Sequence, residues 1–243
     1  MTMREGQGAG KISRGLVAFA IFAAVCAVSF AVLGVWQLER LAWKNALVAA
    51  VETRSTASPT DLGATDWSSI RPDTSEYLRV SVTGQFNGVD TLTKAVTALG
   101  GGFWVLTPLR LADGRAVLVN RGFVTPDQRQ DIPRPQGAVT VTGLLRASEP
   151  DGGFLRANDP AGNRWYSRDV TAIGQALGYS GLAPFFIDAD AGATPYPVGG
   201  LTVLSFPNNH LVYALTWFGL ALLALFAFFY LLRDRWIRRR GAG

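Results

Sequence analysis

The sequence predicts an α+β membrane protein in which two transmembrane helices flank an antiparallel β-rich domain, a small barrel or sandwich, with one or two short helices. Two uncharged apolar runs, residues 15–38 and 211–232, are each long enough to cross a bilayer core of about 30 Å as helices. Between them, short alternating apolar runs are separated by turns rich in Gly and Pro. The net charge of +5 lies at the two ends of the chain, outside both runs.

The first element is a basic tail, residues 1–14, followed by the apolar run 15–38. Apolar and polar residues at helical spacing predict that this helix continues to about residue 54, and Ser58-Pro59 stops it. A cleaved signal peptide is disfavoured because the apolar run is long and leads into a polar helix. The first run is therefore expected to stay as a membrane span.

Basic residues at the outer ends of both spans predict the topology. Residues 1–14 and 233–243 carry the surplus of Arg and Lys, whereas residues 39–210 are close to neutral. We therefore expect both termini in the cytoplasm and residues 55–209 in the periplasm of a bacterial inner membrane. The mitochondrial intermembrane space would be the equivalent compartment. A nucleic-acid binder would instead carry its basic surface on the folded domain.

Alternating apolar residues predict the strands of the domain between the spans. Asp113-Gly114 is a strong hairpin signal between two of these runs. Asp169 can cap a short helix that Gly178 ends. The expected strands are residues 77–86, 103–111, 116–121, 139–145, 185–187 and 201–206.

Scarce reactive side chains exclude several classes of function. His210 and Cys26 are the only residues of their types, so disulfides, zinc clusters and copper sites of several ligands are excluded. No His or Cys lies between the spans, where a catalytic triad would have to form, and we expect no enzyme. Residues 100–102 (GGG) lack the Lys of a phosphate-binding loop and predict a flexible loop before a strand. Asp188 and Asp190 are typical of an exposed turn.

His210 is the most informative polar residue, because it starts the second span after Asn208-Asn209, which can cap the helix. Tyr213, Ala214 and Trp217 continue its face at helical spacing, and Trp36 and Gln37 end the first span at the same membrane level. An axial nitrogen beside an apolar slot at the membrane surface is what a haem requires. A lone interfacial histidine is also commonly a hydrogen-bonded boundary residue. Both interpretations stay open on these residues alone.

Arg121, Trp165, Tyr166 and Arg168 form a second set of interest in the outer domain. They could clamp carboxylates or a partner protein, since Arg forms paired hydrogen bonds to a carboxylate. The alternative is structural, with Trp165 and Tyr166 in the core and Arg168 paired to an acidic neighbour.

Several blocks in this sequence resemble the Surfeit locus protein one family of cytochrome c oxidase assembly factors. They follow the family order and the same layout of two spans. The blocks are Leu33–Arg40 (LGVWQLER) with Trp43-Lys44, Thr107-Pro108-Leu109, Val119–Val124 (VNRGFV), Asn158-Asp159-Pro160, Trp165–Asp169 (WYSRD), Phe186–Ala189 (FIDA), Gly199-Gly200 and Asn208–Leu220 (NNHLVYALTWFGL). Residues 87–102 match no block, and their role stays open.

The resemblance implies an assembly factor for a haem–copper terminal oxidase that assists the insertion of haem a into the catalytic subunit. The histidine of the Asn-Asn-His block, His210, is then the expected ligand of the haem iron, with Tyr213, Trp217, Trp36 and Gln37 around the haem. Expected contacts to haem propionates or to the oxidase are Arg121, Trp165, Tyr166, Arg168 and Asn209. The expected partners are the oxidase catalytic subunit, haem A synthase and membrane lipid.

Two alternatives to a haem carrier are open. The first is a membrane-anchored scaffold that stabilises the catalytic subunit and binds no haem. The second is a hydrolase anchored by two spans, which the missing nucleophile and base disfavour.

Overall fold

The computed structural model describes residues 14–153, 155–192 and 194–240, and the chain divides into two compact units. One unit holds the residues up to 48 and from 206 onward, and the other holds residues 49–205. The expected N-terminal tail, apart from Arg14, lies outside the described residues.

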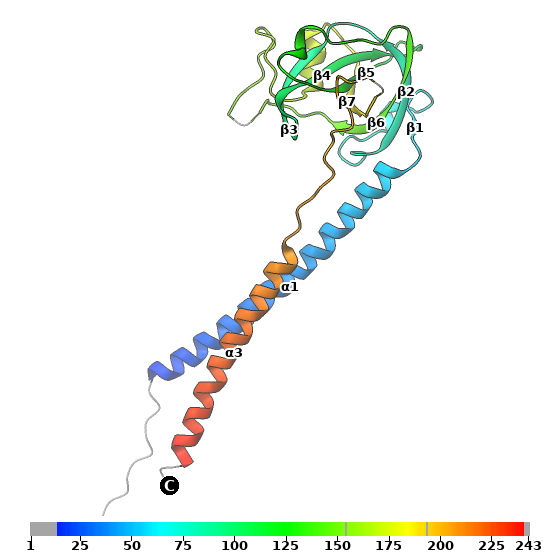
Figure 1. Ribbon diagram of the computed structural model, residues 1–243. Coiled ribbons are helices and arrows are strands. Elements are labelled where there is room, and N and C mark those ends of the chain that lie inside the picture. The colour runs from blue at the N-terminus through cyan, green and yellow to red at the C-terminus, as the bar shows by residue number, and fades with distance from the viewer. Residues whose placement is uncertain (1–13, 154, 193, 241–243) are drawn as a thin grey trace, which may run out of the picture. The chain divides into compact units, whose positions relative to one another are not determined.

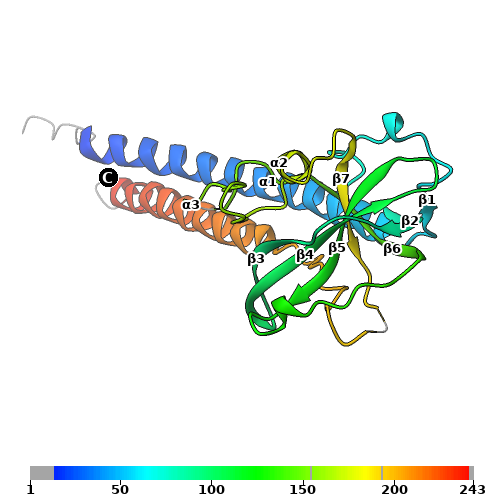
Figure 2. The same cartoon turned by 90° about the horizontal axis from the view of Figure 1, so that it is seen from above.

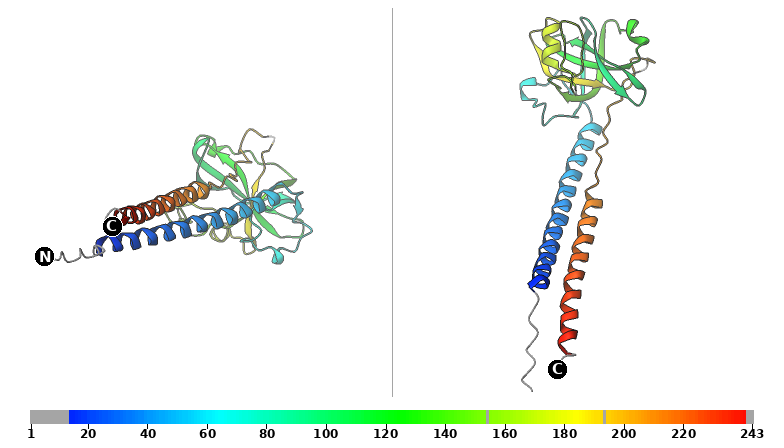
Figure 3. Two further views of the ribbon diagram at one scale, coloured as in Figure 1. Left: turned by 90° about the horizontal axis from the view of Figure 1, so that it is seen from below. Right: turned by 90° about the vertical axis from the view of Figure 1, so that its left-hand side faces the viewer.

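Two long helices make up most of the first unit. They are α1 (Arg14–Thr56) and α3 (His210–Arg240), and both are long and apolar enough to span a membrane. α1 continues as one helix through the polar residues that follow the apolar run, and α3 continues into the expected basic tail. Within this unit the two helices lie side by side (Figure 2 and Figure 3).

Small residues are the buried ones along this helix pair. Ala23, Ala27 and Gly34 on α1, and Ala214 and Ala221 on α3, are buried, while most large apolar side chains of both helices are exposed. Small side chains let helix backbones approach closely, which is the usual basis of helix association in lipid. The exposed apolar side chains are suited to contact with lipid chains.

The second unit is a β-barrel with two further strands and one short α-helix outside the closed ring (Figure 1). The ring β2-β6-β7-β5-β4 closes because β2 also pairs with β4. β1 and β3 extend the sheet from β2 and β4. The strands are β1 (Thr60–Asp61), β2 (Arg79–Phe86), β3 (Thr91–Thr97), β4 (Gly100–Arg110), β5 (Ala116–Val124), β6 (Ala138–Ala147) and β7 (Leu182–Ala189).

The barrel is not wholly antiparallel, and that part of the expectation is wrong. β5 pairs with β7 in parallel, as does β1 with β2. The remaining neighbours in the ring are antiparallel. A closed ring of five strands cannot alternate direction at every step, so at least one pair of neighbours must be parallel.

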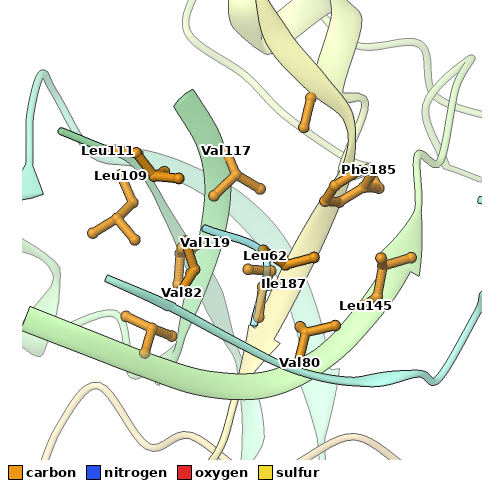
Figure 4. Close-up of a cluster of buried hydrophobic side chains, with 12 residues drawn as sticks. Leu62, Val80, Val82, Leu109, Leu111, Val117, Val119, Leu145, Phe185 and Ile187 are labelled. Carbon is orange, nitrogen blue, oxygen red and sulfur yellow. The ribbon is translucent and has the colours of Figure 1, made fainter. Parts of the chain in front are cut away.

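Inward-facing side chains of the barrel strands form the main core. Figure 4 shows Val80 and Val82 of β2, Val119 of β5 and Ile187 of β7 directed toward one another. A second cluster lies on the outer face of β5 and β7, where Leu118 and Phe186 pack against Trp165 and the short helix α2 (Val170–Ala176). β5 and β7 are therefore buried on both faces, which explains their continuous apolar sequences.

The short helix α2 (Val170–Ala176) begins and ends as the sequence indicates. The Asp169 side chain accepts a hydrogen bond from the amide of Ala172 at 3.0 Å. Gly178, with a φ of 74°, follows the last turn. Two 3₁₀ turns, η1 (Trp67–Ser69) and η2 (Gln128–Gln130), complete the unit.

Two other expectations about the domain are wrong. Residues 201–206 alternate in sequence but form no strand, and Val203 is 75% exposed. Conversely, residues 100–102 begin β4 and are not a flexible loop. Their hairpin partner is β3, a strand rich in Thr within the unmatched stretch 87–102, where apolar alternation is weak. Gly102 packs so closely that an added Cβ would lie 2.3 Å from the carbonyl oxygen of Val124.

Candidate functional site

His210 is the first residue of α3, and its imidazole contacts α1. His210 Nδ1 lies 2.8 Å from Gln37 Oε1. The neighbouring Asn208 joins the same two segments, since its Nδ2 donates to Asn45 Oδ1 at 2.9 Å and its Oδ1 accepts from the His210 amide at 3.4 Å. The start of α3 is therefore fixed to α1 by two side-chain hydrogen bonds, one from Asn208 and one at His210 itself.

The partner of Nδ1 determines which nitrogen of His210 is available to a ligand. A side-chain amide oxygen only accepts hydrogen bonds, so an imidazole that donates to it from Nδ1 keeps a lone pair on Nε2. Metal-bound histidines are held in this way, with the second ring nitrogen donating to an oxygen of the protein. The His210–Gln37 pair thus presents one oriented nitrogen ligand.

Aromatic residues lie two helical turns farther along both helices. Trp217 stacks on Phe30, with ring centroids 5.7 Å apart, and Phe218 packs against Gly34. Trp36 and Tyr213 are 53% and 56% exposed. The structure therefore brings together His210 with Gln37 and Trp217 with Phe30, and it leaves Trp36 and Tyr213 on the surface of the helix pair.

Phe30 was not among the residues expected at this site. A signal for it exists in the sequence, because Phe30 precedes Gln37 by seven residues and Trp217 follows His210 by seven. Residues seven apart share a helix face, and two antiparallel helices bring such pairs into register.

The donor set at the helix pair fits a single axial ligand and not a multidentate metal site. Within the described ranges no group of three or more His, Cys, Asp or Glu side chains could hold a metal ion. One oriented imidazole nitrogen next to aromatic side chains is compatible with a haem, whose iron needs an axial nitrogen and whose ring needs apolar surroundings.

A buried ion-pair network centred on Asp188 lies in the barrel unit. The Asp188 side chain is 6% exposed. It accepts hydrogen bonds from Asn120 (2.8 Å), Arg146 (2.8 Å), Arg168 (3.0 Å) and Thr202 (3.0 Å). The expectation that Asp188 and Asp190 lie in an exposed turn is wrong for Asp188, which is a residue of β7 on the face opposite the barrel core.

Glu149 and Glu76 extend this network at its edge. Glu149 binds Arg168 through both carboxylate oxygens, and Glu76 binds Arg146. Burial opposes ionisation of Glu149, but the hydrogen bonds and charge of Arg168 outweigh it and hold the pKa of Glu149 below its usual value. Three carboxylates thus surround two guanidinium groups, which leaves the cluster with a net negative charge.

Arg168 therefore has the acidic partners that the structural interpretation expects. The cavity beside the network measures about 160 Å³, which is smaller than the usual pocket for a small molecule.

Trp165 is 2% exposed and belongs to the second core cluster. Tyr166 is half-buried, with Lys94 and Arg156 each 5.5 Å from its ring. The expected contacts of Trp165, Tyr166 and Arg168 to a partner or to haem propionates stay predictions. The role of the exposed Asn209 is likewise a prediction.

Arg121 is separate from that network. It lies on β5 with its side chain 6% exposed, and it faces Asp90 and the ring of Phe86. Neither its burial nor these neighbours was evident from the sequence, because Asp90 belongs to the stretch that matched no known block.

These features define a class: a closed β-barrel inserted between two apolar helices, with one histidine oriented at the start of the second helix. Residues 24–222 match the model of the SURF1 family. Surfeit locus protein 1 from Mus musculus is 33% identical over 85% of this chain and 72% of its own length, and the Xenopus tropicalis protein is 34% identical over 77% and 67%. A SURF1-like protein from Monosiga brevicollis is 34% identical over 83% and 82%. The chain belongs to the SURF1 family.

Proposed function

We propose that this chain is an assembly factor for a haem–copper terminal oxidase, which binds haem a and assists its insertion into the catalytic subunit. The contact of 2.8 Å between His210 Nδ1 and Gln37 Oε1 is the observation that carries the proposal, because an Nδ1 that donates leaves Nε2 as the nitrogen ligand. His210 would bind the haem iron, Gln37 would hold the imidazole in place, and Trp217 would contact the macrocycle. The haem is cargo, so the chain needs no catalytic group of its own.

The same proposal includes a location. Both helices would span the bacterial inner membrane, with both termini in the cytoplasm and the barrel in the periplasm. The basic flanks support this orientation. His210 would then lie at the periplasmic membrane surface, close to the catalytic subunit and to haem A synthase as a source of haem.

A carrier must also release its ligand. One protein imidazole binds a haem less tightly than a pair of axial ligands would, and transfer requires that the oxidase bind it more tightly than the carrier does. The single histidine of this chain suits that requirement.

The test is a visible spectrum of the full chain purified from cells that make haem a, compared with His210→Ala and with Thr216→Ala. Thr216 lies on the same helix, and its hydroxyl bonds only its own helix backbone among the described contacts. We expect bound haem a in the wild type and in Thr216→Ala, and its loss in His210→Ala.

Absence of haem from the wild-type chain would overturn the carrier proposal. Co-purification of the oxidase catalytic subunit with both the wild type and His210→Ala, again without haem, would favour the scaffold alternative. Haem retained in full by His210→Ala would show that another residue binds it.

A further inference from the structure

A cavity of about 790 Å³ lies at one end of the barrel. It is lined by Val119 and Val141, which belong to the barrel core, and by Phe86, where β2 ends. We call this end of the barrel, with its cavity, the barrel mouth. Small-molecule sites commonly have this size, and barrel mouths are a common place for them.

Arg121 is the unusual residue of the barrel mouth. Val117 and Val119 of β5 face the core, so Arg121 occupies the next inward position of the same strand. Its side chain is 6% exposed, its Nη2 donates to the carbonyl oxygen of Pro133, and its guanidinium carbon lies 5.2 Å from the centre of the Phe86 ring. Placing a guanidinium inside an apolar barrel is costly unless it is well paired.

The pairing of Arg121 is incomplete. Its Nη1 is buried and has no hydrogen-bond partner among the described residues, and the nearest carboxylate oxygen, Asp90 Oδ1, is 3.5 Å away. The same oxygen is bound more closely by Arg134, at 2.8 Å. Two cations thus share one carboxylate. Burial lowers the pKa of Arg121. The charge of Arg134 lowers it further, whereas Asp90 raises it. Arg121 still remains charged near neutral pH.

The other charges at the mouth cancel. Arg79 binds Asp190 at 2.5 Å, and both line the cavity. The barrel mouth therefore has an excess of one positive charge, located at Arg121 and Arg134, beside walls formed by Phe86, Val139 and Pro135.

We propose that the barrel mouth binds an amphipathic anion, an apolar chain or ring that carries one carboxylate or phosphate group. The anion binds to the guanidinium group of Arg121, whose Nη1 has no hydrogen-bond partner among the described residues, and offsets the excess positive charge that Arg121 shares with Arg134. The apolar part covers Phe86 and Val139. This site lies within residues 49–205 and does not rest on the proposed haem function.

The test is calorimetric titration of the full chain in phosphatidylcholine nanodiscs with octanoate, octyl phosphate and octanol. The first two probes distinguish a carboxylate from a phosphate, and octanol has the same chain without a charge. A hydrogen bond to a charged group predicts that the preferred anion binds about tenfold or more tightly than octanol.

Charge variants locate the site. Arg121→Gln and Arg134→Gln should each weaken binding of the anion about tenfold. Asp90→Asn should strengthen it, because the positive excess rises while an amide oxygen still accepts the hydroxyl of Thr107. Arg71→Gln makes the same charge change at an exposed position outside the cavity and should alter affinity less than twofold. If Arg121→Gln fails to fold, as judged by circular dichroism, the weaker binding of Arg134→Gln and the stronger binding of Asp90→Asn test whether the anion binds at the barrel mouth.

Three results would overturn the proposal. The first is no saturable binding of either anion. The second is equal affinity for octanol and the anions, which would indicate an apolar cavity only. The third is an equal loss in Arg71→Gln and Arg134→Gln, which would indicate a general effect of net charge.

Discussion

The imidazole of His210 and the side-chain amide of Gln37 form a hydrogen bond of 2.8 Å across 173 residues of sequence. With the Gln37 oxygen as acceptor, this contact favours the tautomer that carries the proton on Nδ1 of the single histidine in the chain. It also joins the start of α3 to the second half of α1, together with the Asn208–Asn45 bond.

Gln37→Leu should reduce the haem a bound by the purified chain about tenfold, because loss of an outer partner of a metal-bound histidine typically costs 10- to 100-fold in affinity. Gln37→Glu keeps an acceptor for Nδ1 and should retain most of the haem. Gln175→Leu, at an exposed position of α2, serves as the control. Haem content measured from the visible spectrum checks this, and equal haem in Gln37→Leu and the wild type would contradict it.

Gly34→Leu should destabilise the helix pair by about 1–3 kcal/mol, the usual cost of overpacking. A Cβ at residue 34 would lie 2.6–2.8 Å from three ring atoms of Phe218. Gly219→Leu is the matched control, since nothing lies within 4 Å of its added Cβ. Unfolding by SDS titration, followed by tryptophan fluorescence, compares them. Equal stability of the two variants would show that close packing at Gly34 is unimportant.

Asp188→Asn should lower the free energy of unfolding of the barrel by about 1–3 kcal/mol, because Arg146 and Arg168 lose their shared carboxylate and keep only Glu76 and Glu149. Asp73→Asn breaks an exposed pair with Arg71 and should cost less than about 1 kcal/mol. Thermal unfolding by circular dichroism measures both. A similar small effect of the two substitutions would argue against a structural role for the network.

The pH dependence of stability should contain a contribution from Glu149. The pKa of Glu149 is lower in the folded chain than its usual 4.5, so its ion pair with Arg168 stabilises the fold fully above that value. The contribution is lost as the pH falls below 4.5 through the folded pKa. The stability difference between the wild type and Glu149→Gln should therefore be constant near neutral pH and shrink in acid. A difference that stays unchanged down to pH 3 would contradict this.

Much of the architecture follows from local patterns. The structure confirms the two apolar helices, the hairpin at Asp113-Gly114 and the helix capped by Asp169. The sequence predicts these features because each depends on neighbouring residues. Residues 201–206 show the limit of this reasoning, since an alternating segment becomes a strand only if a free sheet edge accepts it.

By itself, the sequence determined the two apolar helices, the basic ends, a small β-domain between them and the isolation of His210. Only the tertiary structure decided that the barrel closes through a parallel β5–β7 pair, that Asp188 is buried between two arginines and that Arg121 points into the barrel mouth. The physical reason is the distance along the sequence over which each feature is set. Helix and strand periodicity is set within a few residues, whereas these contacts depend on how strands far apart in sequence align, and each register brings different side chains together.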